Sequence, residues 1–300
     1  MTIAALVAAV LGGMALPHML RLRRADPATA VALWGAGLGL RALLVVGTVV
    51  GALILLHPGH LLRAFAEFPC EGHRAAGHAV AALGGLALTV SVIVAVVRLV
   101  QATTAVRRLV HSSLGRGPDN SLIVGGDDVV LAAAGLARPR LVVSAGALAQ
   151  LDDDELAAAL AHEHAHIRRC HRYILLYAEF CRVLGRPLPG TTNALRQLRF
   201  HIERDADRSA VRRRADRLAL ASAICKAATG TTARPRLVPL GGDGTAARVR
   251  ELLEGTGPAH ASRRLQALAA GATTLVVGVA LAMPAALSTL GDPITVCGAV

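Results

Sequence analysis

Residues 151–170 read LDDDELAAALAHEHAHIRRC, and they constrain the fold more than any other stretch because they combine helix-starting residues with a His-Glu-x-x-His pattern. Asp152 is suited to be an N-cap, and Glu155 three residues later completes a capping box. Because positions i and i+4 share one face of a helix, His162 and His166 can aim both imidazoles at one metal ion. The stretch therefore predicts a helix that carries half of a metal site.

Glu163 stands directly after the first of these histidines, one position round the helix. Its carboxylate can act there as a general base without being a metal ligand. The alternative is that the two histidines are ordinary surface or core residues. The capped helical context favours a zinc site, so we expect one Zn²⁺ ion per chain and a catalytic role for Glu163.

A second acidic segment, residues 201–207 (HIERDAD), lies on a predicted helix that can fold back antiparallel to the first. A catalytic zinc ion generally takes three protein ligands, so two histidines are not enough. Glu203 and Asp207 share a helical face, so Glu203 can be the third ligand while Asp207 accepts a hydrogen bond from a ligand histidine. The alternatives are Asp205 as the ligand, or an Arg/Asp face exposed to solvent.

Other polar residues near the motif fit the site less well. Glu179 follows His166 by about 13 residues on what reads as one continuous helix, and this places it roughly 20 Å along the helix axis. It is therefore a poor third ligand. We expect the remaining histidines of this region, His164, His171 and His201, to be exposed to solvent.

The apolar residues are gathered into long runs of Ala, Val, Leu and Gly. They make up 54% of the chain, whereas aromatic residues make up only 2%. Runs of this length are typical of membrane spans. The sequence predicts four spans, at about residues 2–20, 31–56, 79–100 and 268–290.

The net charge of +12 is almost wholly arginine, with Lys226 the only lysine. No basic patch with interleaved aromatic residues is present, so we expect no direct contact with nucleic acid. The basic loops at residues 21–24, 107–108 and 263–264 flank the spans and, by the positive-inside rule, belong in the cytoplasm. Arg41, inside the second span, is expected to have a packing or interface role. Both termini then face outward from the plasma membrane.

These observations predict a mainly α, four-helix polytopic membrane protein with a cytoplasmic α+β metalloprotease domain. Three regions are expected: a membrane region (1–100), the protease domain (101–264), and the fourth span with a short external tail (265–300). Short β-rich runs predict a small sheet before the metal-binding helix, with strands near residues 121–124, 129–133 and 140–144. An exposed strand there could pair with an extended peptide, or could be a purely structural hairpin.

The five cysteines divide according to this topology. Cys70 and Cys297 fall outside the membrane, where an oxidising exterior makes a disulfide between them plausible. The other three, Cys170, Cys181 and Cys225, fall in the cytoplasm with no Cys-x-x-Cys spacing. We expect these three to be reduced, buried, small apolar residues.

The run RLVVSAGALAQLDDDELAAALAHEHAHIRR, followed by Glu-x-x-Ala-Asp at residues 203–207, resembles the BlaR/MecR-type integral-membrane zinc metallopeptidases. It is similar, more distantly, to the heat-shock and CAAX-processing membrane proteases. The resemblance implies a zincin-like, gluzincin-type domain. It also implies a cytoplasmic protein substrate, often a transcriptional repressor.

The leading functional hypothesis is a zinc-dependent membrane endopeptidase with a regulatory role. Two alternatives stand beside it: a quality-control membrane protease, and a non-proteolytic zinc-binding signalling or scaffolding protein. The intact Glu163 favours an enzyme, because a protein that only binds zinc has no need of the base. We expect a protein substrate and the lipid bilayer as partners.

Overall fold

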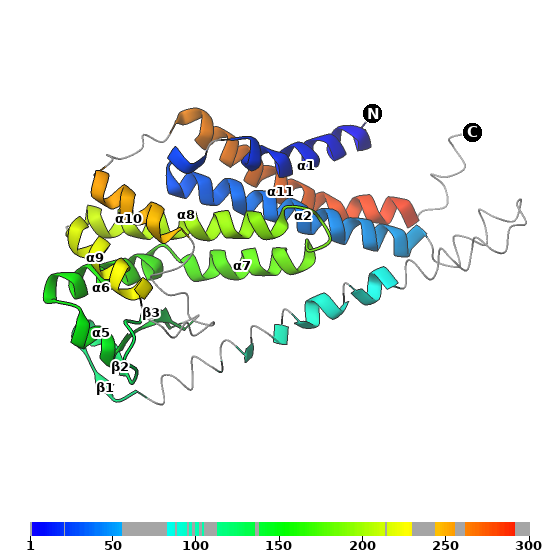
Figure 1. Cartoon of the computed structure of the whole chain (residues 1–300). Coiled ribbons are helices and arrows are strands. Elements are labelled where there is room, and N and C mark those ends of the chain that lie inside the picture. The colour runs from blue at the N-terminus through cyan, green and yellow to red at the C-terminus, as the bar shows by residue number, and fades with distance from the viewer. Residues whose placement is uncertain are drawn as a thin grey trace, which may run out of the picture.

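The computed structural model describes residues 2–20, 22–55, 113–135, 138–213, 215–229, 244–255 and 262–291, together with residue 104 and most of 83–101. Helices dominate these residues (Figure 1). The helices that build the site and its surroundings are α1 (Thr2–Met19), η1 (Leu22–Arg24), α2 (Pro27–Leu55), α5 (Ala145–Gln150), α6 (Asp153–Arg168), α7 (His171–Leu184), α8 (Thr191–Arg212), α9 (Arg217–Thr229), α10 (Thr245–Glu254) and α11 (Arg263–Gly291). A short 3-10 turn, η2 (Pro118–Asn120), lies before the second strand.

Helix α2 contacts α1, α7, α8 and α11, and these helices run side by side as one bundle (Figure 1). Leu33 and Trp34 of α2 belong to one buried apolar cluster with Leu198 and Ile202 of α8. The first half of the expected second span is therefore protein core. The helices of the expected membrane region and of the expected protease domain pack around the same core.

Arg41 lies in the middle of α2 and is buried. Its guanidinium donates hydrogen bonds to the carbonyl oxygens of Gly37 (2.9 Å) and Met14 (3.2 Å), and Nη2 lies 3.0 Å from Nε2 of His18. Met14 and His18 are on α1, so the arginine joins α1 to α2. This contact set is the packing role that the sequence suggested.

Among the described residues, two helical segments are long and apolar enough to cross a bilayer, and the predicted count of four is not supported. The two segments are Pro27–Ile54 in α2 and Arg263–Met283 in α11. In α1 the apolar segment Ala8–Met19 is shorter than the roughly 20 residues that a span needs. The third predicted span, 79–100, falls partly outside the described residues, and its described part holds only a shorter apolar helix, Leu83–Val94. The two longer helices indicate membrane association by length and composition alone.

Helix α6 has the capping box that its sequence predicts. Asp152 Oδ1 accepts a hydrogen bond from the Glu155 N–H (2.8 Å), and Glu155 Oε2 accepts one from the Asp152 N–H (2.9 Å). The expectation of one continuous helix through this region is wrong. Cys170 adopts a left-handed backbone (φ 55°), which ends α6 and starts α7 as a separate helix.

A small mixed sheet precedes α6 and has the strand order β1-β2-β4-β3 in the described part of the chain. Strands β2 and β4 are parallel, while β3 runs antiparallel to β4 and forms one edge of the sheet. The three predicted strands are found within about two residues of their expected positions, and β1 is an additional strand. Their bounds are β1 (Gly115–Arg116), β2 (Leu122–Val124), β3 (Leu131–Ala134) and β4 (Arg140–Ser144).

The cysteines follow the sequence-based expectation only in part. Cys181 is buried, as predicted, but Cys170 and Cys225 are exposed. Cys170 is exposed because it lies at the turn between α6 and α7, and Cys225 because its face of α9 is turned away from the core. Cys70 and Cys297 lie outside the described residues, so their disulfide stays a prediction.

Candidate metal centre

Three ligand atoms gather where α6 packs against α8. One ring nitrogen from each of His162 and His166, and one carboxylate oxygen of Glu203, all lie within 4.8 Å of one another. The two Nε2 atoms are 3.1 Å apart, and each lies 3.5 to 3.6 Å from one Glu203 oxygen. Two imidazoles and one carboxylate are a donor set that catalytic zinc takes in proteins, so this group could hold a metal ion.

The antiparallel packing of α6 and α8 brings these residues together. His162 lies against both Glu203 and Asp207, whereas His166, one turn further along α6, lies against only the first of these two carboxylates. His162 and His166 are four residues apart on α6, and Glu203 and Asp207 are four residues apart on α8. The two members of each pair therefore share one face of their helix. The sequence predicted this pairing of faces, and the structure places all four side chains at the helix contact.

Asp207 lies behind the first histidine. Its Oδ1 is 2.9 Å from Nδ1 of His162, which is hydrogen-bonding distance, although the ring N–H is not aligned for a strong bond. A carboxylate at Nδ1 leaves Nε2 of His162 free to face the cluster. Asp207 is therefore placed to orient this imidazole.

Arg248, on α10, was missed by the sequence analysis and is central to the cluster. Its Nη1 lies 2.9 Å from Oε2 of Glu203, and its Nε and Nη2 each donate to one oxygen of Asp207 at 2.7 Å. The side chain is fully buried, and the two carboxylates raise its pKa in spite of that burial. The only sequence signal is that Arg248 shares a face with Leu252, an arginine on the apolar side of an amphipathic helix.

Asp205 does not join the three ligand atoms, so the alternative of Asp205 as third ligand is not favoured. Its Oδ2 lies 3.1 Å from Nε2 of His171, and Nδ1 of His171 lies 3.0 Å from Nδ1 of His166. Arg169 donates to the other Asp205 oxygen at 2.6 Å. A chain of contacts therefore runs from Nδ1 of His166 through His171 to Asp205.

The expectation that the remaining histidines are exposed is wrong for two of the three. His171 is 2% exposed and His201 is 0% exposed, because each is enclosed between helices. The side chain of His164 is 34% exposed and lies 3.3 Å from Asp119. Glu179, judged a poor ligand from the sequence, forms ion pairs away from the cluster, with Arg182 and Arg199.

Glu163 is 5% exposed and lies between α6 and the edge strand β3. Its Oε2 accepts a hydrogen bond from the Ala133 N–H at 2.9 Å. Burial raises the pKa of the Glu163 carboxyl to about 7, with the negative charge of Glu203 contributing and the charge of His162 opposing the rise. A carboxylate whose pKa is near neutrality can both accept and release a proton at physiological pH.

Two of the three ligand groups have protonation states that suit metal binding. Burial lowers the pKa of His166 to about 3, so this imidazole is neutral at pH 7. Burial raises the pKa of the Glu203 carboxyl, but its interactions with His166, His162 and Arg248 outweigh burial, and the pKa falls to about 2. His162 differs, since the carboxylates around it outweigh burial and raise its pKa to about 9. A metal ion would compete with that proton.

Among known families, the model of Peptidase family M48 matches residues 101–185. The matched range contains His162, Glu163 and His166 and ends at Gly185, before α8, so it includes neither Glu203 nor Asp207. The match supports a metallopeptidase hydrolase and does not test the narrower resemblance to the BlaR/MecR type. No curated protein and no solved structure matches the chain.

Proposed function

We propose that this protein is a membrane-bound zinc endopeptidase. The observation that carries the proposal is the convergence of two imidazole nitrogens and one carboxylate oxygen within 4.8 Å, with Glu163 adjacent on the same helix. The match of residues 101–185 to a peptidase family supports it independently of that geometry.

The residues fit a zinc ion by the chemistry of their donors. His162 and His166 supply nitrogen ligands, and Glu203 supplies an oxygen ligand; zinc binds both kinds of donor in proteins. When bound, zinc supplies a Lewis acid that polarises the scissile carbonyl of the substrate. Asp207 contacts Nδ1 of His162, and the contact chain through His171 to Asp205 begins at Nδ1 of His166. These contacts fix the orientation of the two imidazoles on the side away from the ligand cluster.

Glu163 is the proposed general base. Its carboxylate accepts the proton of the attacking water and then passes it to the amine that leaves when the peptide bond breaks. The hydrogen bond from the Ala133 N–H holds the carboxylate in a fixed position against β3. Burial favours the same role, because a raised pKa lets the carboxyl hold the proton between the two steps.

The edge strand β3 supports an extended peptide as substrate. It pairs with β4 on one side only, and its other edge is turned toward α6 and Glu163. An extended segment of a protein could add to the main-chain groups of that edge other than the Ala133 N–H, which Glu163 already binds, and pass the cluster. Binding along a strand does not require a chain terminus, and this favours an endopeptidase.

Membrane association rests on α2 and α11, which are long and apolar enough to cross a bilayer. The basic pairs at residues 107–108 and 263–264, on either side of the metal domain, favour a cytoplasmic metal centre by the positive-inside rule, and the resemblance of the motif region favours a regulatory target such as a repressor. A quality-control role would use the same site on unfolded membrane proteins.

The test compares membranes of cells that express the wild-type chain or Glu163→Gln at equal levels. Quantitative proteomics should find one or more proteins, with new internal termini, that are cleaved only in the wild type. Equal cleavage in both would exclude Glu163 as the base. No cleavage of any protein in either, with zinc bound to both chains, would favour a non-proteolytic zinc-binding protein.

A further inference from the structure

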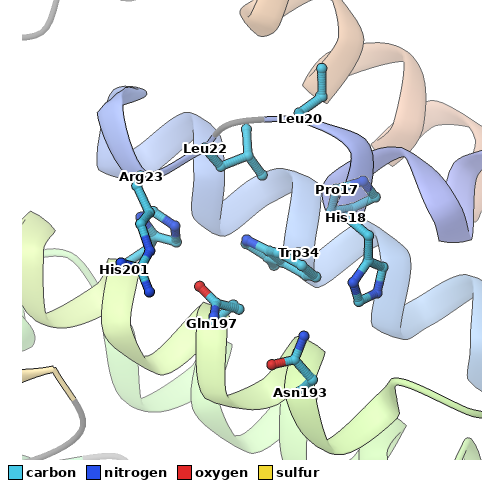
Figure 2. Close-up of a pocket in the computed structure, with 9 residues that line it drawn as sticks. All are labelled: Pro17, His18, Leu20, Leu22, Arg23, Trp34, Asn193, Gln197 and His201. Atoms are coloured by element: carbon cyan, nitrogen blue, oxygen red, sulfur yellow. The ribbon is translucent and has the colours of Figure 1, made fainter.

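A cavity of about 480 Å³ lies between α1, α2 and α8, and the proposed peptidase chemistry does not use it. Its α8 residue His201 precedes Glu203 by two positions, so these side chains leave opposite sides of the helix. Figure 2 shows the polar side chains around the cavity. They are His18 from α1, Arg23 from η1, Trp34 from α2, and Asn193, Gln197 and His201 from α8.

Trp34 stands in the middle of this lining (Figure 2). The side chain is 4% exposed, and its ring packs edge-on against His18 with 4.8 Å between ring centres. The indole Nε1–H is buried and has no hydrogen-bond partner among the described residues. An indole nitrogen can only donate, so the cavity wall holds a donor without an acceptor.

His201 provides a second donor of this kind. Its Nδ1 lies 3.2 Å from Nη1 of Arg204, and a guanidinium only donates, so Nδ1 is the acceptor and the ring proton is on Nε2. His201 is 0% exposed, and Nε2 has no hydrogen-bond partner within the described part of the chain. Buried polar groups in proteins are normally paired, so two unpaired donors in one cavity point to a ligand.

The charge of the lining indicates what kind of ligand fits. Arg23 adds a guanidinium, and the side-chain amides of Asn193 and Gln197 can donate as well. No aspartate or glutamate is among the described residues that line the cavity. A group that accepts hydrogen bonds from several directions and carries negative charge is therefore favoured, and a phosphate group has both properties.

We propose that this cavity binds a phosphate group, held by Arg23, Trp34 and His201. The phosphate can belong to a phospholipid headgroup or to free phosphate. The setting suits a headgroup, since the lining includes the basic turn between α1 and α2, and α2 is a candidate membrane span. The assignment does not depend on the proposed peptidase activity, because none of these three residues is assigned to the metal centre.

The experiment uses the full chain, loaded with zinc, in an uncharged maltoside detergent. Calorimetric titration measures the binding of inorganic phosphate, and native mass spectrometry counts bound phosphatidylglycerol. We expect at least one of the two probes to bind saturably at one site. Arg23→Gln and Trp34→Phe should each weaken that binding about tenfold, as expected for the loss of one charge-assisted hydrogen bond.

Arg116→Gln is the matched control, because Arg116 is an exposed arginine on β1, away from the cavity. It should bind both probes as the wild type does. Saturable binding of phosphate that phosphatidylglycerol does not displace would identify free phosphate as the source, and displacement would identify the lipid. The proposal is overturned if neither probe binds, or if Arg23→Gln binds both probes as tightly as Arg116→Gln does. Because Arg23 is exposed, its substitution should leave folding intact.

Discussion

Arg248 and Asp207 form a two-point contact, in which Nε and Nη2 of the guanidinium each lie 2.7 Å from a different carboxylate oxygen. Both side chains are buried, and Arg248 also contacts Glu203. One arginine from α10 therefore supplies positive charge to both acidic residues that α8 presents to α6. Without it, two carboxylates would lie in the protein interior with only imidazoles for partners.

The first prediction follows from this contact. Arg248→Met should lower the free energy of unfolding of the metal-free protein by about 3–5 kcal/mol, because it leaves buried carboxylates without their countercharge. Arg250→Met changes an exposed arginine on the same helix and should cost less than about 1 kcal/mol. Denaturant unfolding in maltoside detergent measures both. Equal losses for the two variants would contradict the central role of Arg248.

The metal ligands give the second prediction. His162→Ala, His166→Ala and Glu203→Ala should each lose stoichiometric zinc, whereas Glu163→Gln should retain it and lose at least about 100-fold in peptidase rate. Inductively coupled plasma mass spectrometry of the purified variants gives the zinc content. Retention of full zinc by Glu203→Ala would show that another group is the third ligand.

The contact chain behind His166 gives the third prediction. Asp205→Asn should weaken zinc binding by about 10–100-fold without abolishing it, because His171 would lose the carboxylate that orients it. Competition with a chelator of known affinity measures the change. Glu179→Gln, which alters an acidic residue outside the cluster, serves as control and should bind zinc as the wild type does. An Asp205→Asn protein with wild-type affinity would limit Asp205 to its contact with Arg169.

The fourth prediction concerns pH and Glu155. Burial raises the pKa of the Glu155 carboxyl, but hydrogen bonds from Lys226, Ser222 and the Asp152 backbone outweigh it, and the pKa ends below its ordinary value. A carboxylate with a lowered folded-state pKa stabilises the protein above its unfolded pKa of about 4.3, and this stabilisation is lost as the pH falls through the folded pKa.

The melting temperature of the wild type should therefore exceed that of Glu155→Gln by a constant margin between about pH 5 and pH 7, and the margin should shrink below about pH 4. Glu254→Gln, at an exposed position on α10, should follow the wild type at every pH. A margin that stays constant down to pH 3 would show that the Glu155 charge contributes nothing to stability.

The fifth prediction tests the proposed orientation in the membrane. A reporter that is active only in the cytoplasm should work when inserted at residue 117 or residue 257, because residue 117 follows the basic pair at 107–108 and residue 257 precedes the basic pair at 263–264. The same reporter should fail at residue 72. Activity at residue 72 would place the segment between α2 and residue 113 on the same side as the metal centre.

Much of the site could be predicted because its information is local. The spacing of His162, Glu163 and His166, and of Glu203 and Asp207, fixes which side chains share a helical face. Arg248 could not be found in this way. It is more than 40 residues from Asp207 in the sequence, and only its ion pairs across to α8 show that its charge is needed there.

The errors in the fold prediction have two physical causes. A left-handed backbone at a residue other than glycine is uncommon, so the break at Cys170 had no sequence signal. Hydropathy also does not distinguish a helix face that meets lipid from one that meets protein. For this reason the sequence predicts the whole apolar run of α2 to be a membrane span, although Leu33 and Trp34 pack against α8.

The shared core of α2 and α8 makes the catalytic part of this protein inseparable from its N-terminal helices. A truncated chain that begins at residue 101 would leave the apolar face of α8 around Leu198 and Ile202 without its cover, and we expect it to aggregate when expressed alone. Any cleavage of the chain between α2 and β1 should, in contrast, leave the two pieces bound to each other. The pieces would then co-purify as a noncovalent pair.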